Sequence, residues 1–278
     1  MAAQSNFVQA NNLQLHYLDF GNRGAPPIIC IHGLSGNAHH FDGLAPRLAG
    51  RYHVLSLDIR GRGESAWGAA GDYNPVTYVA DLNAFINVLG LGRVSLIGTS
   101  MGGGIAMIFA GGYPDRVERL VLNDIGPEID PVGLKRITDY FTEAPTEFAD
   151  MAEVAAYYRA NYPFLTNVPE PALLEFVKWA VKFTPDGRLT WKLDPAVRNI
   201  PRTGAAARPI DMWVPYARIQ AKILVIRGAE SDILAAATAD RMRMVLPGTQ
   251  TVEVPGTGHA PTLNEPAAVT AIMQFFNV

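Results

Sequence analysis

The residues best suited to chemistry form one short segment, Gly98-Thr99-Ser100-Met101-Gly102-Gly103. It follows an apolar run and opens a segment with a helical pattern. A Gly-x-Ser-x-Gly spacing between a strand and a helix is typical of a tight turn that presents a nucleophilic serine. Glycine flanks the serine because a side chain at either place would collide with neighbouring backbone. We therefore predict that Ser100 is a nucleophile that attacks a carbonyl carbon.

A serine hydroxyl is a poor nucleophile until a base accepts its proton. Of the six histidines, His259 is the best candidate, because it lies in a Gly-Thr-Gly-His loop just past the last strand pattern. A loop there places the imidazole at the carboxyl edge of the sheet, beside the serine turn. His16 and His53 lie within strand patterns and are expected to be packing or surface residues. His39 and His40 open a helix and are expected to be solvated.

A second loop is expected to stabilise the charge that forms on the substrate oxygen. His32-Gly33 follows a buried strand pattern, where a loop usually supplies one backbone N–H to an oxyanion hole. The residue after the nucleophile supplies the other N–H. We expect these donors to be the amides of Leu34 and Met101, whereas His32 is expected to hold the loop in shape.

The elements that position these residues follow from the hydrophobic pattern. Short apolar runs rich in β-branched residues alternate with helical patterns, which indicates a mostly parallel sheet with helices on both faces. Continuous runs such as Ile28-Ile29-Cys30-Ile31 are typical of strands buried on both faces. Alternation from Leu13 to Tyr17 favours an antiparallel edge hairpin. Strands are predicted over residues 13–20, 27–31, 52–57, 93–97, 120–123, 222–227 and 251–254, and helices over residues 38–48, 76–89, 102–110, 235–246 and 267–276.

The alternation stops between about residues 126 and 216, where no convincing strand run is found. Helical patterns over residues 133–141, 152–161 and 172–183 are separated there by loops that contain proline. We predict a helical insertion laid over the carboxyl edge of the sheet. Its tryptophans could line a substrate pocket or form the core of the insertion; they are Trp179, Trp191 and Trp213. Residues 203–207 are expected to be a flexible connector.

Composition excludes several classes of protein. The chain has 278 residues, 49% of them apolar and 18% charged, which is typical of a folded protein with a sizeable core. A net charge of −3 without a long basic run argues against nucleic acid as a partner. Cys30 is the single cysteine, which excludes an intrachain disulfide and a cysteine-based zinc site; a small buried hydrophobe is expected. We expect no cofactor, metal site, secretory signal or membrane span, and a cytoplasmic location.

Taken together, these motifs resemble the α/β-hydrolase superfamily over essentially the full length of the chain. The resemblance implies a mostly parallel eight-stranded sheet flanked by helices, with the core over residues 1–125 and 217–278 and a helical cap over residues 126–216. It also implies that Asp58 and Arg60 belong to a structural turn after the fourth strand. The matching pieces are His32-Gly33, Leu57-Asp58-Ile59-Arg60-Gly61-Arg62-Gly63-Glu64-Ser65, the serine turn, and Gly256-Thr257-Gly258-His259.

The resemblance implies a carboxylate that orients His259, and two positions compete for that role. The usual place in the family is the loop after the seventh strand, where Asp232 precedes two aliphatic residues and is the preferred candidate. This loop is one residue longer than the common form, and Ile233 stands where proline often follows the acid. Some members take the acid from the end of the sixth strand, which here offers Asp124. Glu230 is a third and weaker candidate, because it precedes the expected turn.

The resemblance implies a carboxylesterase-like serine hydrolase that works through an acyl-enzyme. The insertion is rich in aromatic residues, which favours esters with a small, largely apolar acyl or alcohol group. Lactone hydrolysis and hydrolytic carbon–carbon cleavage of diketone-type compounds are the alternatives, because they use the same three groups. Serine at the turn disfavours the dehalogenase and epoxide-opening relatives, which use aspartate there. A small-molecule receptor with the same fold is an alternative of another class. The expected partner is thus a small ester, lactone or diketone-type molecule, with no nucleic acid and no membrane; homodimer formation is left open.

Overall fold

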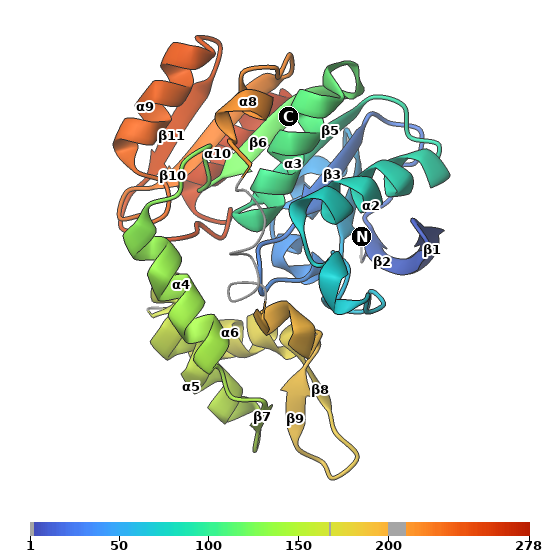
Figure 1. The fold of residues 1–278 in the computed structure, drawn as a ribbon, viewed down its shortest axis with the longest axis vertical. Coiled ribbons are helices and arrows are strands. Elements are labelled where there is room, and N and C mark those ends of the chain that lie inside the picture. Colours follow the sequence, from blue (N-terminus) through green and yellow to red (C-terminus); the bar gives the residue numbers. More distant parts are fainter. Residues whose placement is uncertain (1–2, 167, 200–209) are drawn as a thin grey trace.

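A computed structural model describes residues 3–166, 168–199 and 210–278 of the chain. Its centre is an eight-stranded sheet in the order β1-β2-β4-β3-β5-β6-β10-β11 (Figure 1). Only β2 runs against its neighbours, since it pairs antiparallel with both β1 and β4, and the other pairs are parallel. The predicted mostly parallel sheet and edge hairpin are therefore confirmed. The strands are β1 (Gln4–Ala10), β2 (Leu13–Asp19), β3 (Pro27–Ile31), β4 (His53–Leu57), β5 (Val94–Thr99), β6 (Val117–Asn123), β10 (Lys222–Gly228) and β11 (Gln250–Val254).

Helices cover both faces of the sheet because its central strands are apolar on both sides. Along β3, Ile29 and Ile31 belong to one buried cluster, while Ile28 and Cys30 belong to another. This is the alternation that a strand between two layers requires. One cluster also contains residues of α2 (Pro75–Val88), α3 (Met101–Gly112) and α9 (Ala236–Val245), and the other contains residues of α1 (Ala45–Leu48) and α10 (Pro266–Phe276).

One predicted helix of the core is divided in the structure. Residues 38–48 form a 3₁₀ turn, Ala38–Phe41, followed by the short α1. Pro46 lies in the first turn of α1, where its missing N–H costs nothing. In a continuous helix the same proline would remove a hydrogen bond and its ring would clash with the preceding turn, so a break before it is favoured.

The insertion contains helices but also a small sheet, which corrects the expectation of no strand there. The strands β7 (Glu147–Phe148), β9 (Leu189–Trp191) and β8 (Val181–Phe183) pair antiparallel in this order. The helix predicted over residues 172–183 is α6 (Glu170–Val177), then a 3₁₀ turn, Lys178–Ala180, and then β8. A hairpin forms instead because Gly187 adopts a positive φ of 85° in the turn between β8 and β9.

Most of the insertion gathers at one end of the large sheet (Figure 1). This group comprises α4 (Pro131–Glu143), α5 (Met151–Asn161), α6 and the small sheet. In contrast, α8 (Trp213–Tyr216) lies against α3, where Gly111 leaves room for the backbone of Pro215. The connector expected over residues 203–207 lies outside the described residues. No helix in the part of the chain described combines the length and apolar character needed to cross a membrane.

Candidate active site

Ser100 lies on a sharp corner between β5 and α3, in a backbone conformation that side-chain-bearing residues rarely adopt. Its φ is 51° and its ψ is −120°. A Cβ on Gly98 would lie 2.5 Å from the Cα of Gly103, and a Cβ on Gly102 would lie 2.2 Å from the carbonyl oxygen of Ile31. Both distances are far below van der Waals contact, so only glycine permits this corner. The Gly-x-Ser-x-Gly spacing is therefore explained by backbone packing around the serine.

We expect Gly98→Ala to destabilise the protein by about 3 kcal/mol or more, because the added methyl group meets backbone that has no room to move. Gly104→Ala is the matched control. It lies on α3, just past the corner, with nothing within 4 Å of its hypothetical Cβ, and alanine raises helix propensity by about 1 kcal/mol. Urea unfolding of both variants measures the difference. Equal stabilities would contradict the packing explanation.

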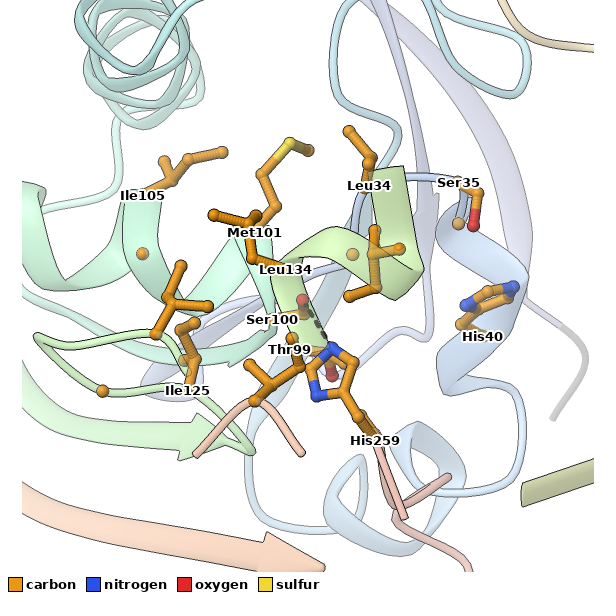
Figure 2. Close-up of a pocket in the computed structure, with 18 of the residues that line it drawn as sticks. Leu34, Ser35, His40, Thr99, Ser100, Met101, Ile105, Ile125, Leu134 and His259 are labelled. Carbon is orange, nitrogen blue, oxygen red and sulfur yellow. Dashed lines mark hydrogen bonds between the residues drawn. The ribbon is translucent and has the colours of Figure 1, made fainter. Parts of the chain in front are cut away.

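His259 reaches the serine from the loop that follows β11. Its Nε2 lies 2.9 Å from Ser100 Oγ (Figure 2). The loop is held in place by Asn123, whose side-chain amide donates a hydrogen bond of 2.8 Å to the carbonyl oxygen of Pro261. The structure thus brings together the two residues that sequence reasoning paired. The contribution of Asn123 was missed, because nothing in its type or spacing signals it.

Asp124, at the end of β6, supplies the carboxylate next to His259. Its Oδ2 lies 2.7 Å from His259 Nδ1 and also accepts a hydrogen bond of 2.7 Å from Ser231 Oγ. Its Oδ1 accepts a hydrogen bond of 2.8 Å from the backbone N–H of Gly228. The side chain is fully buried, so these donors replace the solvation that an ionised carboxylate requires. This arrangement favours a proton on Nδ1 of His259 and leaves Nε2 free to accept one from Ser100.

The preference for Asp232 as this carboxylate is corrected by the structure. Its two oxygens accept hydrogen bonds of 2.5 and 2.9 Å from Arg136 of α4, and it makes no hydrogen bond to His259. The bonds from Arg136 hold the pKa of Asp232 below its usual value. In the loop after β10, Ser231 contacts the carboxylate of Asp124, whereas Asp232 turns toward the insertion. Glu230, the third candidate, is exposed.

Leu34 and Met101 both line the cavity that contains Ser100 (Figure 2). Met101 is the first residue of α3, so its N–H has no partner within the helix. The loop that carries Leu34 approaches the serine closely, since a Cβ on Gly33 would lie 3.5 Å from Ser100 Cβ. The two backbone amides named from the sequence therefore belong to segments that meet at the serine.

His32 is fully buried under this loop. Its Nδ1 donates to the carbonyl oxygen of Gly33 at 2.7 Å, and its Nε2 accepts from the N–H of Ile59 at 3.0 Å. Both bonds fit a neutral ring, and burial lowers the pKa of His32 to about 4. The ring therefore ties the loop after β3 to the turn after β4, which agrees with the structural role expected of it.

We expect His32 to make the protein less stable as the pH falls from about 6.5 to about 4. Over this range the unfolded state binds a proton that the folded state excludes, so the free energy of unfolding decreases by up to about 3 kcal/mol. In His32→Asn, whose amide can still donate to the Gly33 carbonyl, this part of the decrease should vanish. Urea unfolding at several pH values measures both proteins. Identical pH dependences would contradict the neutral ring.

The turn around Asp58 and Arg60 is structural. Asp58 accepts hydrogen bonds from the backbone N–H groups of Ala38 and Glu64, at 2.6 and 2.9 Å, and from His16 Nδ1 at 2.7 Å. The guanidinium of Arg60 forms an ion pair with Asp81 and Asp72. His53 similarly contacts Asp19 at 3.1 Å. These contacts anchor the segments beneath the serine and do not reach it.

His39 and His40 are not solvated as expected, because the insertion covers them. The ring of His39 stacks on Trp179 with centroids 3.6 Å apart. The ring of His40 stacks on Phe176 with centroids 4.5 Å apart. Burial lowers the pKa of His40 to about 3, so its ring is neutral at pH 7. A helical pattern on its own cannot reveal what packs over it.

The cavity above Ser100 has a volume of about 650 Å³. Among the described residues that line it, none is Asp, Glu, Lys or Arg. Its walls are mostly apolar, and the insertion contributes the aromatic rings of Tyr140, Tyr162, Phe164 and Phe176. None of the three tryptophans considered from the sequence lines it; Trp191 packs instead against Phe148 in the core of the insertion. Such a cavity suits an uncharged, largely apolar molecule.

Cys30 lies outside this cavity. Cys30 is fully buried in the middle of β3, and burial raises the pKa of its thiol. It therefore packs as a small hydrophobe, as expected.

Within residues 3–166, 168–199 and 210–278, no group of three or more His, Cys, Asp or Glu side chains is arranged to hold a metal ion.

A parallel sheet with a serine corner after β5 and a histidine loop after its last strand defines the α/β-hydrolase fold. A family model described as "Alpha/beta hydrolase family" matches residues 28–272, and the chain belongs to this family. The chain is 34% identical to a 3-hydroxybutyrate-oligomer hydrolase from Cupriavidus necator, over 95% of this chain and 92% of that protein. It is 27% identical to a 2-(acetamidomethylene)succinate hydrolase from Mesorhizobium japonicum, over 87% and 84%.

The architecture is matched by solved structures as well. An α/β-hydrolase from Novosphingobium aromaticivorans superposes with a TM-score of 0.90 at 34% identity, covering 100% of this chain and 99% of that chain. The named relatives are hydrolases, and they support a hydrolytic enzyme activity for this chain.

Proposed function

We propose that this protein is a serine hydrolase of uncharged carboxylic esters. The observation that carries the proposal is the continuous chain of contacts from Ser100 Oγ to His259 to Asp124, at 2.9 and 2.7 Å. A hydroxyl, an imidazole and a buried carboxylate in this order form the arrangement that activates serine for acyl transfer.

In the proposed mechanism, Ser100 Oγ attacks the ester carbonyl carbon while His259 Nε2 takes the hydroxyl proton. The backbone N–H groups of Leu34 and Met101 stabilise the oxyanion of the tetrahedral intermediate. His259 then donates the proton to the leaving alkoxide, and the ester C–O bond breaks to give an acyl-enzyme. Water, deprotonated by the same imidazole, attacks the acyl carbon, and the released Ser100 oxygen regains its proton. Asp124 stabilises the imidazolium in both halves of the reaction.

The cavity supports a particular class of ester. Because no charged side chain lines it within the described residues, a carboxylate on the substrate would lose its hydration without gaining a cation. This disfavours dianions of the succinate type, which the M. japonicum relative is named for. The C. necator relative is named for oligomers of 3-hydroxybutyrate, which contain ester bonds between short aliphatic units and end in one carboxylate; in this cavity that carboxylate would have to stay in solvent. Esters built from one or a few such short aliphatic units fit the cavity of about 650 Å³.

Hydrolysis of paired substrates tests the proposal. We expect kcat/KM for p-nitrophenyl hexanoate to exceed that for the p-nitrophenyl monoester of adipic acid at least tenfold, since the second carries a terminal carboxylate. Lactones and vinylogous diketones, assayed alongside, distinguish the lactonase and carbon–carbon hydrolase activities. Ser100→Ala is the blank. No hydrolysis of any ester above that blank would refute the proposal, and steady ester turnover would exclude a pure receptor.

A further inference from the structure

One side of the catalytic cavity carries polar groups for which the proposed mechanism has no use. Figure 2 shows Ser35 and His40 on one side of Ser100, and the aliphatic side chains of Ile105 and Ile125 on the other. The cavity is therefore two-sided around the serine. A substrate bound at Ser100 would meet the side chains of Ile105 and Ile125 in one direction, and Ser35 and His40 in the other.

Tyr162 of the insertion completes the polar side. Its hydroxyl lies 2.8 Å from Ser35 Oγ, and both residues line the cavity. Ser35 belongs to the same loop as Leu34, which is proposed to donate to the oxyanion. The pair therefore joins the loop beside the serine to the segment that covers it. Burial raises the pKa of Tyr162, so its hydroxyl keeps its proton at neutral pH.

His40 is held in this group by packing. Its ring stacks on Phe176, which packs against Phe164, which in turn packs against Tyr162, with centroids 4.5, 6.4 and 5.9 Å apart. On its other side, a Cβ on Gly36 would lie 2.9 Å from His40 Nδ1, so glycine leaves the space that the ring occupies. The orientation of the imidazole is thus fixed before any ligand arrives.

The ring of His40 makes no hydrogen bond to any residue in the described parts of the chain. A neutral imidazole offers one N–H donor and one acceptor nitrogen. His40 is half-buried, so its ring nitrogens are not sealed in the protein interior. Because the ring faces the cavity, a bound molecule can supply a hydrogen-bond partner.

We propose that Ser35, His40 and Tyr162 form a subsite that binds a second, uncharged hydrogen-bonding group of the substrate, a carbonyl or hydroxyl several atoms from the scissile carbonyl. The inference rests on the proposed esterase function. The subsite orients the substrate, so that its polar group lies toward these three residues and its hydrocarbon part lies toward Ile105 and Ile125. These residues determine specificity and do not touch the reacting atoms.

The test compares p-nitrophenyl hexanoate with p-nitrophenyl 4-oxohexanoate and 5-oxohexanoate, which differ from it by one ketone. His40→Phe keeps an aromatic ring against Phe176 but removes both nitrogens, and Tyr162→Phe removes the hydroxyl only. The measured quantity is kcat/KM for a ketoester divided by kcat/KM for the hexanoate, taken for whichever ketoester the wild-type protein hydrolyses faster. In each variant we expect this ratio to fall about five- to tenfold, as for one lost neutral hydrogen bond. Titration of the reactive serine with a fluorophosphonate corrects for any misfolded fraction.

Ile105→Val is the matched control, because it shortens a side chain on the aliphatic side and should change the ketoesters and the hexanoate alike. Ratios that stay the same in His40→Phe and Tyr162→Phe, for both ketoesters, would overturn the subsite while leaving the esterase proposal intact. Failure of the wild-type protein to hydrolyse any of the three esters would instead refute the esterase proposal and the subsite with it.

Discussion

Ser100→Ala is expected to lower kcat for p-nitrophenyl hexanoate by about 10⁶-fold, a loss comparable to removal of the nucleophile in other serine hydrolases. Without the hydroxyl no acyl-enzyme forms, and His259 has no oxygen from which to take a proton. The remaining rate comes from binding and from the oxyanion donors alone. A burst of p-nitrophenol followed by steady release, present in the wild-type protein and absent in the variant, would show the acyl-enzyme directly.

Fluorophosphonate labelling provides an independent measurement of the same residue. The wild-type protein should be labelled and Ser100→Ala should not. Ser95→Ala is the matched control, since Ser95 lies on the same strand, β5, but does not line the cavity, and its variant should still be labelled. Ester hydrolysis by Ser100→Ala at a rate near that of the wild-type protein would remove this serine from the mechanism.

Asp124→Asn is expected to lower kcat by about 10⁴-fold with little change in KM. An asparagine can turn its NH₂ group toward His259 Nδ1, which then holds the proton on Nε2, where it can no longer accept one from Ser100. The asparagine also cannot stabilise the imidazolium. The expected loss therefore concerns the chemical step and not the binding of the ester.

Asp232→Asn is the control for this substitution. It weakens a partly exposed ion pair with Arg136, a type of contact that contributes about 1 kcal/mol or less to stability. We expect kcat to stay within about tenfold of the wild-type value, since this aspartate makes no hydrogen bond to His259. The reverse ranking of the two variants would return the catalytic role to Asp232.

The fold and the central residues could be predicted from sequence because local rules determine them. Continuous apolar runs such as the one through Ile29 are compatible with a strand between two layers, and the glycines around Ser100 are demanded by a corner that admits no side chain. His259 could be found because a loop after the last parallel strand can only emerge at the edge where the serine lies. Each of these inferences uses residues close together in the chain.

The choice between the two aspartates could not be made in this way. It depends on β6 and β10 lying side by side in register, so that Asp124, after the end of β6, meets donors at the end of β10 and in the loop that follows it, Gly228 and Ser231. Similarly, His39 and His40 have a helical pattern that gives no sign of the insertion above them. Sequence periodicity describes one element at a time, whereas these positions are set by contacts between elements distant in the chain.

Asp124, directly after β6, contacts the imidazole of His259, whereas Asp232, in the loop after β10, contacts the insertion. Here Asp232 makes no hydrogen bond to His259 and instead ties α4 of the insertion to the core through Arg136. Positions 232 and 136 can therefore be changed without removing a hydrogen-bond partner of His259. We expect substitutions there to change how the insertion is held over the cavity while the contacts of His259 stay in place.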